Sequence, residues 1–393
     1  MNALLLLGAV LGTLLYSPNS HAYVWMIRHG YGECAACHTD PSGGEGLTQM
    51  GRVQSELLLS QAWSSRPELT SNAKTLSSLD EPDWLRLGGS IRGMSILDLP
   101  HGGAPADLTA FPMQLDVYSS VSIGQFRAGA SVGYADVPLA SPHLRAAQVF
   151  QKESGPNMIS RSHWLGWAPS DGWLLRAGRL NLPYGLRISE HVQWVRDATK
   201  TDRESDQQHG LALAHSYARW RWELMGVLGN FQIQPDAVRE RGYAGYLEYR
   251  VLGELAVGLQ SEVLHSKESI QFGRTEPTTR QAHGLTLRYA PTTSVVLLAE
   301  GSMLAATDRN LGHVALLTAD YEPVQGLHLA LSEEMLDSGN PKGQAPLVGA
   351  GKTTTGSWLT LHWFPVAHWD LQVDFVSRYS TTPTVQAQLH YYL

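Results

Sequence analysis

The chain has little cysteine, little charge and, after its first 16 residues, no long apolar segment. Only two of its 393 residues are cysteine, 17% are charged and the formal net charge is −7. Two cysteines exclude a disulfide framework, and the acidic balance argues against a nucleic-acid partner. No apolar run after Tyr16 is long enough for a transmembrane helix. A mean hydropathy of −0.18 leaves a membrane β-barrel open, because its lipid-facing residues alternate with polar ones.

Residues 1–22 are predicted to be a signal peptide. An apolar run from Leu4 to Tyr16 precedes the small-x-small site Ser20-His21-Ala22. The usual basic start is missing, since no Lys or Arg precedes Arg28. A retained membrane anchor is the alternative, although the run is too short to span comfortably. We expect export to an oxidising compartment.

The stretch Cys34-Ala35-Ala36-Cys37-His38 has the C-x-x-C-H pattern of a c-type haem attachment site. Two thiols bond the vinyl groups of one haem edge, and His38 is placed to bind the iron as proximal ligand. A redox or structural cysteine pair, or half a zinc site, is the alternative. A zinc site needs more Cys or His ligands nearby than these. The pattern therefore predicts one covalently bound haem c.

The remainder of the segment 23–83 is expected to fold around this motif. The glycine-rich stretch 40–46 suits either a tight fold at a haem edge or a solvated linker. A helix is predicted over 47–63, capped by Thr48. The composition of 64–81 indicates a linker.

The sixth ligand of the iron stays open. Met50 on the predicted helix, or His29 before the motif, is a candidate distal ligand, and Met26 is a further one. A five-coordinate iron, or a ligand from the rest of the chain, is the alternative.

From Trp84 onward the dominant pattern is strict alternation of apolar and polar residues, as in 113–123, 285–289 and 385–393. Such alternation is typical of half-buried strands, of a soluble sandwich or of a membrane barrel. We predict strands at 84–98, 111–123, 126–136, 161–168, 173–182, 209–217, 219–229, 242–251, 254–266, 282–290, 294–305, 312–321, 326–336, 354–364, 368–379 and 384–393.

The connections favour the membrane barrel. Short turns alternate with longer loops, which is the pattern of outer-membrane barrels, and about 16 strands is an even number, as such barrels have. An even number puts both ends of the barrel on the short-turn, periplasmic side. Tryptophans fall near the predicted short turns, as an interfacial girdle requires: Trp84, Trp167, Trp173, Trp220, Trp222, Trp363 and Trp369.

Polar strand positions of both signs are expected to face the lumen: Arg86, Arg92, Asp116, Arg176, Glu248, Arg250, Arg288, His362 and Asp374. They indicate a partly filled, charge-laced interior. The longest loop, 183–208, carries balanced charges and is expected to be solvated. An inward constriction or an outside docking surface is the alternative for this loop.

With its N-terminal haem motif and its predicted barrel, the chain resembles the outer-membrane cytochrome–porin fusions, among them the iron oxidases of iron-oxidising bacteria. The resemblance rests on Cys34, Cys37 and His38, followed by Pro41, Leu47 and Gly51-Arg52. Met50 stands where that family tends to have an aromatic residue. The resemblance implies an all-β fold: an antiparallel transmembrane β-barrel of about 16 strands at 84–393, with a small helical haem c segment at 23–83.

The function expected from this likeness is electron transfer at the outer membrane, with the haem segment on the periplasmic side. Expected partners are the lipid bilayer, periplasmic c-type cytochromes and extracellular metal ions or minerals. A solute porin with an N-terminal plug and no redox role is the alternative. An extracellular Fe(II) oxidase is a third hypothesis, and the sequence offers no separate catalytic residues for it.

Overall fold

The fold is described from a computed structural model. The structure describes residues 23–30, 32–61, 82–100, 103, 105–137, 147–149, 154–188, 190, 192–231, 239–268, 276–342, 352–379 and 381–393. The predicted signal peptide 1–22 and linker 64–81 lie outside these residues.

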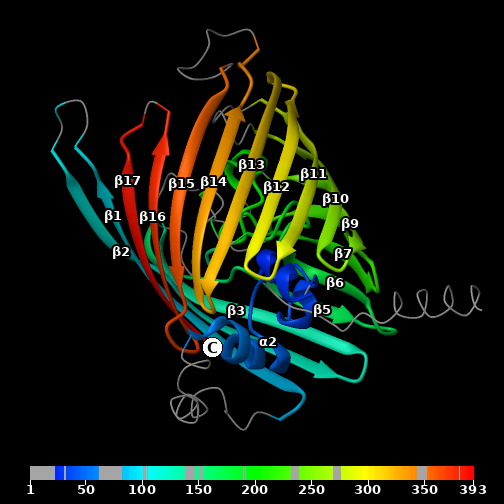
Figure 1. Ribbon diagram of the computed structural model, residues 1–393. Helices are drawn as coiled ribbons and strands as arrows, with labels where there is room; N and C mark the ends of the chain where they lie inside the picture. The colour runs from blue at the N-terminus through cyan, green and yellow to red at the C-terminus, as the bar shows by residue number, and fades with distance from the viewer. Residues whose placement is uncertain are drawn as a thin grey trace, which may run out of the picture.

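One antiparallel sheet contains every named strand of the described residues (Figure 1). Its strands are β1 Leu85–Asp98, β2 Asp107–Ile123, β3 Phe126–Val137, β4 Gly155–Ile159, β5 His163–Trp167, β6 Trp173–Leu180, β7 Gln208–Tyr217, β8 Trp220–Gly229, β9 Arg241–Leu252, β10 Leu255–Ser266, β11 Thr278–Thr292, β12 Val295–Ala306, β13 Arg309–Val324, β14 Leu327–Asp337, β15 Thr354–Trp363, β16 Trp369–Arg378 and β17 Thr384–Tyr392. Because β4 and β5 pair with successive parts of β3, they act as one interrupted strand, and the wall has 16 strands among the described residues.

The sheet closes on itself, since β1 pairs with both β2 and β17. Along the strands, side chains alternate between an exposed apolar outer face and a buried, largely polar inner face. In β10, for example, Leu259 is 57% exposed, whereas the next residue, Gln260, is 4% exposed. A closed sheet with an apolar exterior and a polar interior is a transmembrane β-barrel. This arrangement excludes the soluble sandwich.

The predicted strands are confirmed with small shifts at their ends. The one clear difference concerns the predicted strand 161–168, because β4 occupies residues that we expected in a loop. The chain is irregular at Ser160–Ser162, where the backbone N–H of Ser131 bonds to the carbonyl of Ser162 at 2.8 Å. This irregular step directs Arg161 into the lumen, where it pairs with Asp116.

Both ends of the barrel lie at the short-turn rim, as predicted. The backbone N–H of Leu393 bonds to the carbonyl of Gly89 at 2.9 Å, next to the start of β1. The predicted girdle is also present: six of its tryptophans are between 36% and 50% exposed, namely Trp84, Trp167, Trp173, Trp220, Trp363 and Trp369. Amphipathic rings in this position mark a membrane–water interface.

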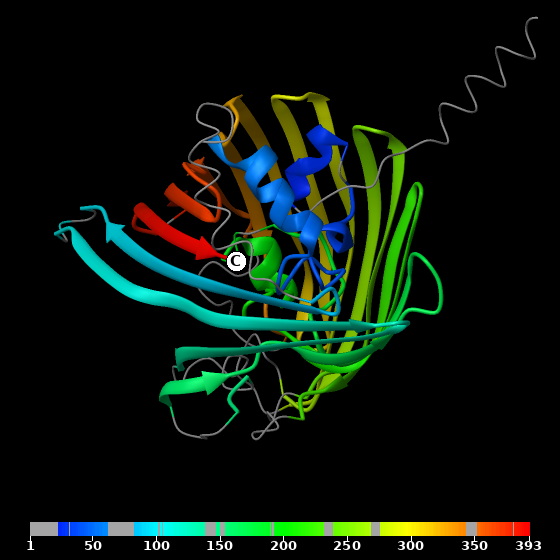
Figure 2. The same ribbon diagram turned by 90° about the horizontal axis from the view of Figure 1, so that it is seen from below.

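The N-terminal segment lies inside the ring of strands (Figure 2). It contains two 3₁₀ turns, η1 Val24–His29 and η2 Cys34–Ala36, the helix α2 Gln49–Gln54 and the π-helical turn η3 Ser55–Leu59. The predicted helix 47–63 is therefore interrupted within its described part, and residues 62–63 lie outside the described residues. It leaves helical geometry at Ser60, where the chain is extended. Beyond it, Gln61 bonds through its backbone N–H to Phe364 at the short-turn rim.

The loop 183–208 also folds into the lumen, so the expectation of a solvated loop is wrong for its described residues. The short helix α6 (Trp194–Thr199) is largely buried. The backbone N–H groups of Leu186 and Trp194 donate to Glu300 and Glu334 of the opposite wall, each at 2.8 Å. Arg196 of the loop pairs with Glu300 of β12, and the described part of the loop therefore follows the inward alternative.

Among the described residues, no helix is long and apolar enough to cross a membrane.

We expect Leu285→Arg to destabilise the barrel. Leu285 is 62% exposed on the outer face in the middle of β11. An arginine on the lipid face near the bilayer midplane costs about 2–4 kcal/mol. Thr293→Arg, in the exposed turn after β11, is the matched control and should leave stability nearly unchanged. Denaturant unfolding in lipid vesicles measures both variants, and equal stabilities would contradict the assignment of the outer face.

Candidate functional site

The C-x-x-C-H loop is held in shape by the residues that follow it. The backbone N–H of Thr48 donates to the carbonyl of Cys37 at 2.8 Å, and the Thr48 hydroxyl donates to the carbonyl of Ala36 at 2.6 Å. The same hydroxyl accepts the backbone N–H of Gly51 and caps α2, as predicted. A single side-chain oxygen therefore connects the motif to the helix.

Gly51 allows α2 to approach the motif closely. A Cβ atom at this position would lie 2.3 Å from the carbonyl oxygen of Cys37, a distance that a side chain cannot adopt. The next residue, Arg52, donates to the carbonyl of Leu87 in β1. Gly51 therefore packs against the motif, and Arg52 contacts the barrel wall.

The loop after the motif is fixed to the wall by a buried ion pair. Asp40 and Arg176 of β6 are fully buried, with 2.6 Å between Asp40 Oδ1 and Arg176 Nη1. Arg176 also pairs with Glu223 of β8, and the backbone N–H of Ser42 donates to Asp40 at 2.7 Å. Burial raises the pKa of Asp40, but Arg176 and Ser42 outweigh it and hold the pKa below its ordinary value.

Glu45, at the end of the glycine-rich stretch, lies against the neighbouring strand β5. Its carboxylate accepts the indole N–H of Trp164 at 3.0 Å. Burial, together with the charge of Asp40, raises the pKa of Glu45 to about 7.

A second anchor holds the start of the segment. Arg28 of η1 pairs with Asp320 and, at 2.8 Å, with Glu322 near the end of β13. Trp25 lies beside His328 of β14, with 4.2 Å between ring centroids. The segment is therefore attached to opposite sides of the lumen.

Both cysteines of the motif are buried and neither forms a disulfide. Cys34 is 5% exposed and Cys37 is 2% exposed. The Sγ atom of Cys34 lies 3.3 Å from Nη1 of Arg221 in β8. Both sulfur atoms are therefore outside any disulfide.

His38 is enclosed together with the cysteines. Burial and the positive charge of Arg203 together lower its pKa to about 4, against the opposing effect of Asp40. The neutral imidazole is the form that binds a metal. Its Nδ1 atom is buried and has no hydrogen-bond partner among the described residues. Two thiols and this imidazole are the donors that a c-type haem needs.

A cavity with an empty volume of about 1590 Å³, part of it open to solvent, lies beside the motif. Cys37, His38, Gly43 and Gly44 form its motif side. The barrel contributes polar residues, among them Arg92, Arg161, Asp370 and His390.

The structure does not bring the two predicted distal ligands into this cavity. Met50 is 47% exposed on α2 and accepts a hydrogen bond from Gln54 at its sulfur. His29 lies 4.0 Å from Glu322, beside the anchor of Arg28. Met26, the further candidate from the sequence, does line the cavity, as do other side chains that can ligate iron: Met94, Met113, His362 and His390. The assignment of the sixth ligand to Met50 or His29 stays a prediction.

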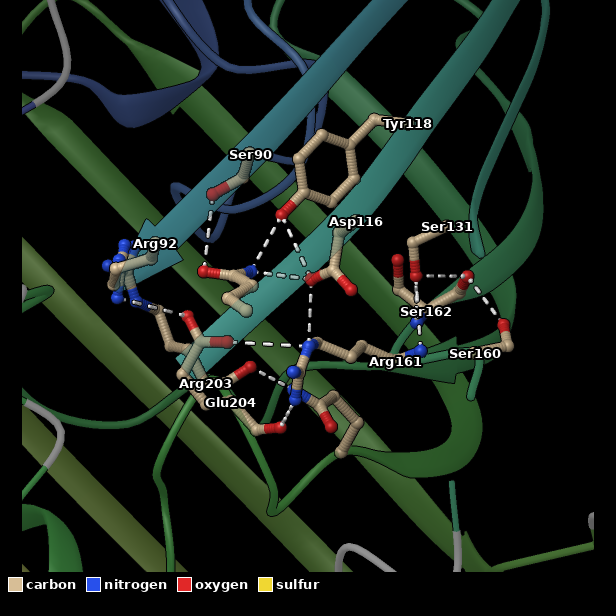
Figure 3. A network of polar contacts seen from close by, with 12 residues as sticks. Ser90, Arg92, Asp116, Tyr118, Ser131, Ser160, Arg161, Ser162, Arg203 and Glu204 are labelled. Carbon is tan, nitrogen blue, oxygen red and sulfur yellow. Dashed lines mark hydrogen bonds and ion pairs between the residues drawn. The ribbon is translucent and has the colours of Figure 1, made fainter. Parts of the chain in front are cut away.

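A polar network on the wall faces the same cavity (Figure 3). Arg161 donates from Nε to Asp116 at 2.9 Å and lies 3.4 Å from a carboxylate oxygen of Glu204. Asp116 also accepts from Gln114 and from the hydroxyl of Tyr118. Of these residues, the alternation of the strands indicated Gln114, Asp116 and Tyr118. The others become neighbours through strand register and through the inward loop, which no local pattern reveals.

Comparisons with known proteins support the barrel. No protein-family model matches the sequence. No curated protein matches it either. Among solved structures, OmpT of Vibrio cholerae in its trimer form is 12% identical, with a TM-score of 0.56 over 79% of this chain and 99% of that chain. The anion-selective porin from Comamonas acidovorans is 12% identical, with a TM-score of 0.53 over 79% and 99%. The channel DcaP of Acinetobacter baumannii is 12% identical, with a TM-score of 0.52 over 79% and 97%.

The fold is therefore a porin-like, closed antiparallel barrel of the kind found in the outer membrane. At this level of identity the likeness concerns the fold alone, and none of it addresses the N-terminal motif.

We expect Gly51→Ala to loosen the packing of α2 on the motif. The added methyl group would collide with the carbonyl of Cys37, and overpacking of this kind costs about 1–3 kcal/mol. Gly253→Ala is the matched control, because a Cβ there meets no atom within 4 Å. Protease cleavage within residues 23–61 should become faster in the first variant only. Equal protection of the two variants would contradict the close approach.

Proposed function

We propose that this protein is an outer-membrane electron-transfer protein, in which a porin-like barrel encloses one haem c attached to Cys34 and Cys37. The observation that carries the proposal is the position of the C-x-x-C-H loop. It lies inside the lumen, neither cysteine forms a disulfide, and the loop borders a cavity that is partly open to solvent. A plug that only blocked a channel would require neither the two thiols nor the buried imidazole.

Each element of the site has a part in this proposal. Cys34 and Cys37 would hold the group covalently, and His38 would bind its iron. Asp40, through Arg176, fixes the orientation of the loop against the wall. Bound in this place, a haem supplies one-electron transfer, with a potential that depends on its ligands, its burial and nearby charge.

The position of the N-terminal segment also favours exchange of electrons at the short-turn end of the barrel. Arg52 and Ser55 contact Leu87 and Tyr392 at the short-turn rim, which in outer-membrane barrels faces the periplasm. Periplasmic c-type cytochromes are the partners proposed at this rim. The apolar band of such barrels is about 25 Å tall. An extracellular donor or acceptor, such as a metal ion, therefore has to enter the lumen or use a further carrier.

A solute channel with an N-terminal plug is the second candidate. The observation that favours it is the likeness to porins and channels, among them an anion-selective porin. A freely open pore is disfavoured, because the N-terminal segment and the loop 183–208 both occupy the lumen.

A covalent haem is the first test. The full chain, produced in a host with a cytochrome c maturation system, is expected to show a c-type reduced-minus-oxidised spectrum and haem staining on a denaturing gel. Cys34→Ala should lose the covalent stain while the barrel still inserts in the membrane. The same gene in a host that lacks maturation is the control. An intact barrel that carries no haem in the competent host would contradict the proposal.

Conductance in planar bilayers tests whether the intact protein is an open solute channel. Deletion of residues 23–83 removes the anchors at Asp40 and Arg28, and we expect large conductance steps to appear that the intact chain lacks. Arg28→Ala should increase brief openings only partly, because the Asp40 anchor remains. Large steps of equal size in the intact and shortened proteins would favour the solute channel.

A further inference from the structure

Three lumen-facing side chains of the barrel wall have the geometry of a nucleophile, a base and an orienting carboxylate. The Oγ atom of Ser90 in β1 lies 2.9 Å from Nε2 of His390 in β17. The Nδ1 atom of the same imidazole lies 3.0 Å from Oδ2 of Asp370 in β16. All three residues are buried and line the cavity beside the motif. A hydroxyl, an imidazole and a carboxylate in this order are the parts of a serine hydrolase triad.

The triad is assembled by the register of three neighbouring strands. Asp370 is directly opposite His390 in the pairing of β16 with β17. Ser90 is opposite Tyr392 in the pairing of β1 with β17, so it is the diagonal neighbour of His390 on the same face. Because β1 and β17 close the barrel, the three groups meet only when the barrel closes. No local pattern reveals the site, since Ser90 and His390 are 300 residues apart in the chain.

The contacts of the imidazole define how it can act as a base. In the tautomer that donates Nδ1–H to the Asp370 carboxylate, Nε2 has the lone pair that accepts the Ser90 proton. The Ser90 hydroxyl has a second acceptor, Oε1 of Gln114, at the longer distance of 3.2 Å. The other carboxylate oxygen of Asp370 lies 3.6 Å from Nε2 of His362. Asp370 is therefore placed to stabilise the imidazolium that forms when His390 takes up a proton.

Arg92 provides a positive charge beside the hydroxyl. It follows Ser90 by two residues, so both side chains lie on the lumen face of β1, and it is directly opposite His390 (Figure 3). It lies 4.0 Å from Glu204, and its Nε atom is buried without a hydrogen-bond partner among the described residues. A guanidinium in an enclosed place can donate to the oxyanion that develops at an attacked carbonyl group.

The orientation of the triad selects the class of substrate. Ser90 is buried on the lumen side, whereas the next residue, Ile91, is 54% exposed on the lipid-facing side. An acyl chain in the bilayer therefore cannot reach the hydroxyl. A solute in the lumen can reach it, because the cavity is partly open to solvent. The cavity is polar on this side and is lined by the amides of Gln114, Gln372, Gln386 and Gln388.

We propose that Ser90, His390 and Asp370 form an esterase site in the lumen that hydrolyses small, water-soluble carboxylic esters. The Ser90 oxygen attacks the ester carbonyl carbon while His390 takes the hydroxyl proton, and the alcohol leaves with that proton as Ser90 becomes acylated. His390 then takes a proton from water, whose oxygen attacks the acyl group, and returns the proton to Ser90 as the carboxylic acid departs. The net reaction consumes one ester and one water. This activity goes beyond the proposed electron transfer and uses barrel residues only.

The first test is covalent labelling of the full chain in proteoliposomes with a fluorophosphonate, which forms an oxygen–phosphorus bond to an activated serine and loses fluoride. Mass spectrometry should find the label on Ser90. His390→Ala should slow the labelling about a hundredfold or more, because the base is lost. Ser55→Ala is the matched control, since Ser55 lines the same cavity but bonds to the hydroxyl of Tyr392 rather than to an imidazole. It should be labelled on Ser90 as fast as the wild type.

The second test is the hydrolysis of p-nitrophenyl acetate. The wild type should give an initial burst of p-nitrophenol as Ser90 is acylated, and Ser90→Ala should lose the burst with at least about a hundredfold of kcat/KM. Asp370 is a positioning residue, because it acts through His390. Asp370→Asn should therefore lower kcat about a hundredfold and leave KM nearly unchanged, and Asp370→Glu should restore part of kcat.

A long-chain ester tests the substrate class. p-Nitrophenyl palmitate in detergent micelles should be hydrolysed no faster by the wild type than by Ser90→Ala, because the triad faces the lumen. Faster hydrolysis of palmitate than of acetate, lost in Ser90→Ala, would overturn the assignment to water-soluble esters.

The outcome does not depend on the haem or on the folding of a variant. Labelling of the wild type needs no substitution, and full-length Cys34→Ser/Cys37→Ser provides the same barrel without a covalent haem. Label on Ser90 in either form supports the triad. Absence of label on Ser90 in both forms overturns the inference, whereas the haem spectrum of the wild type decides the proposed function separately.

Discussion

The buried ion pair between Asp40 and Arg176 is the interaction on which the site depends. Both side chains are fully buried, and an isolated charge in such a place costs several kcal/mol. Glu223, Ser42 and Asn181 add further hydrogen bonds to the pair. Because Asp40 follows His38 by two residues, the pair fixes the motif to the wall of the barrel. Loss of either partner would leave an unpaired charge and release the loop.

The lumen is filled by two parts of the chain that meet at the motif. The N-terminal segment lies at the short-turn rim, and the loop 183–208 enters from the wall between β6 and β7. They join where Arg203 bonds to Gly43, next to Cys34 in space. A barrel filled in this way is poorly suited to wide diffusion, and well suited to hold a group in an enclosed position. The same contacts make the inward loop part of the site.

The barrel could be predicted from the sequence because its strands share one pattern, the alternation of apolar and polar residues. Alternation such as Leu285-Thr286-Leu287-Arg288 follows from lipid on one side and a polar lumen on the other. The C-x-x-C-H motif was likewise visible, since its chemistry fixes the spacing. The inward loop was not predictable, because Arg196 finds its carboxylate at Glu300, about a hundred residues away. A sequence with balanced charges does not show whether those charges are solvated or are paired with residues of a distant strand.

The density around Cys34 and Cys37, in an experimental map of the protein matured in a competent host, tests the central claim most directly. The account predicts continuous density from both Sγ atoms to a flat macrocycle inside the barrel, with His38 on its iron. Unmodified thiols in the mature protein, or an N-terminal segment that lies outside the lumen, would contradict it.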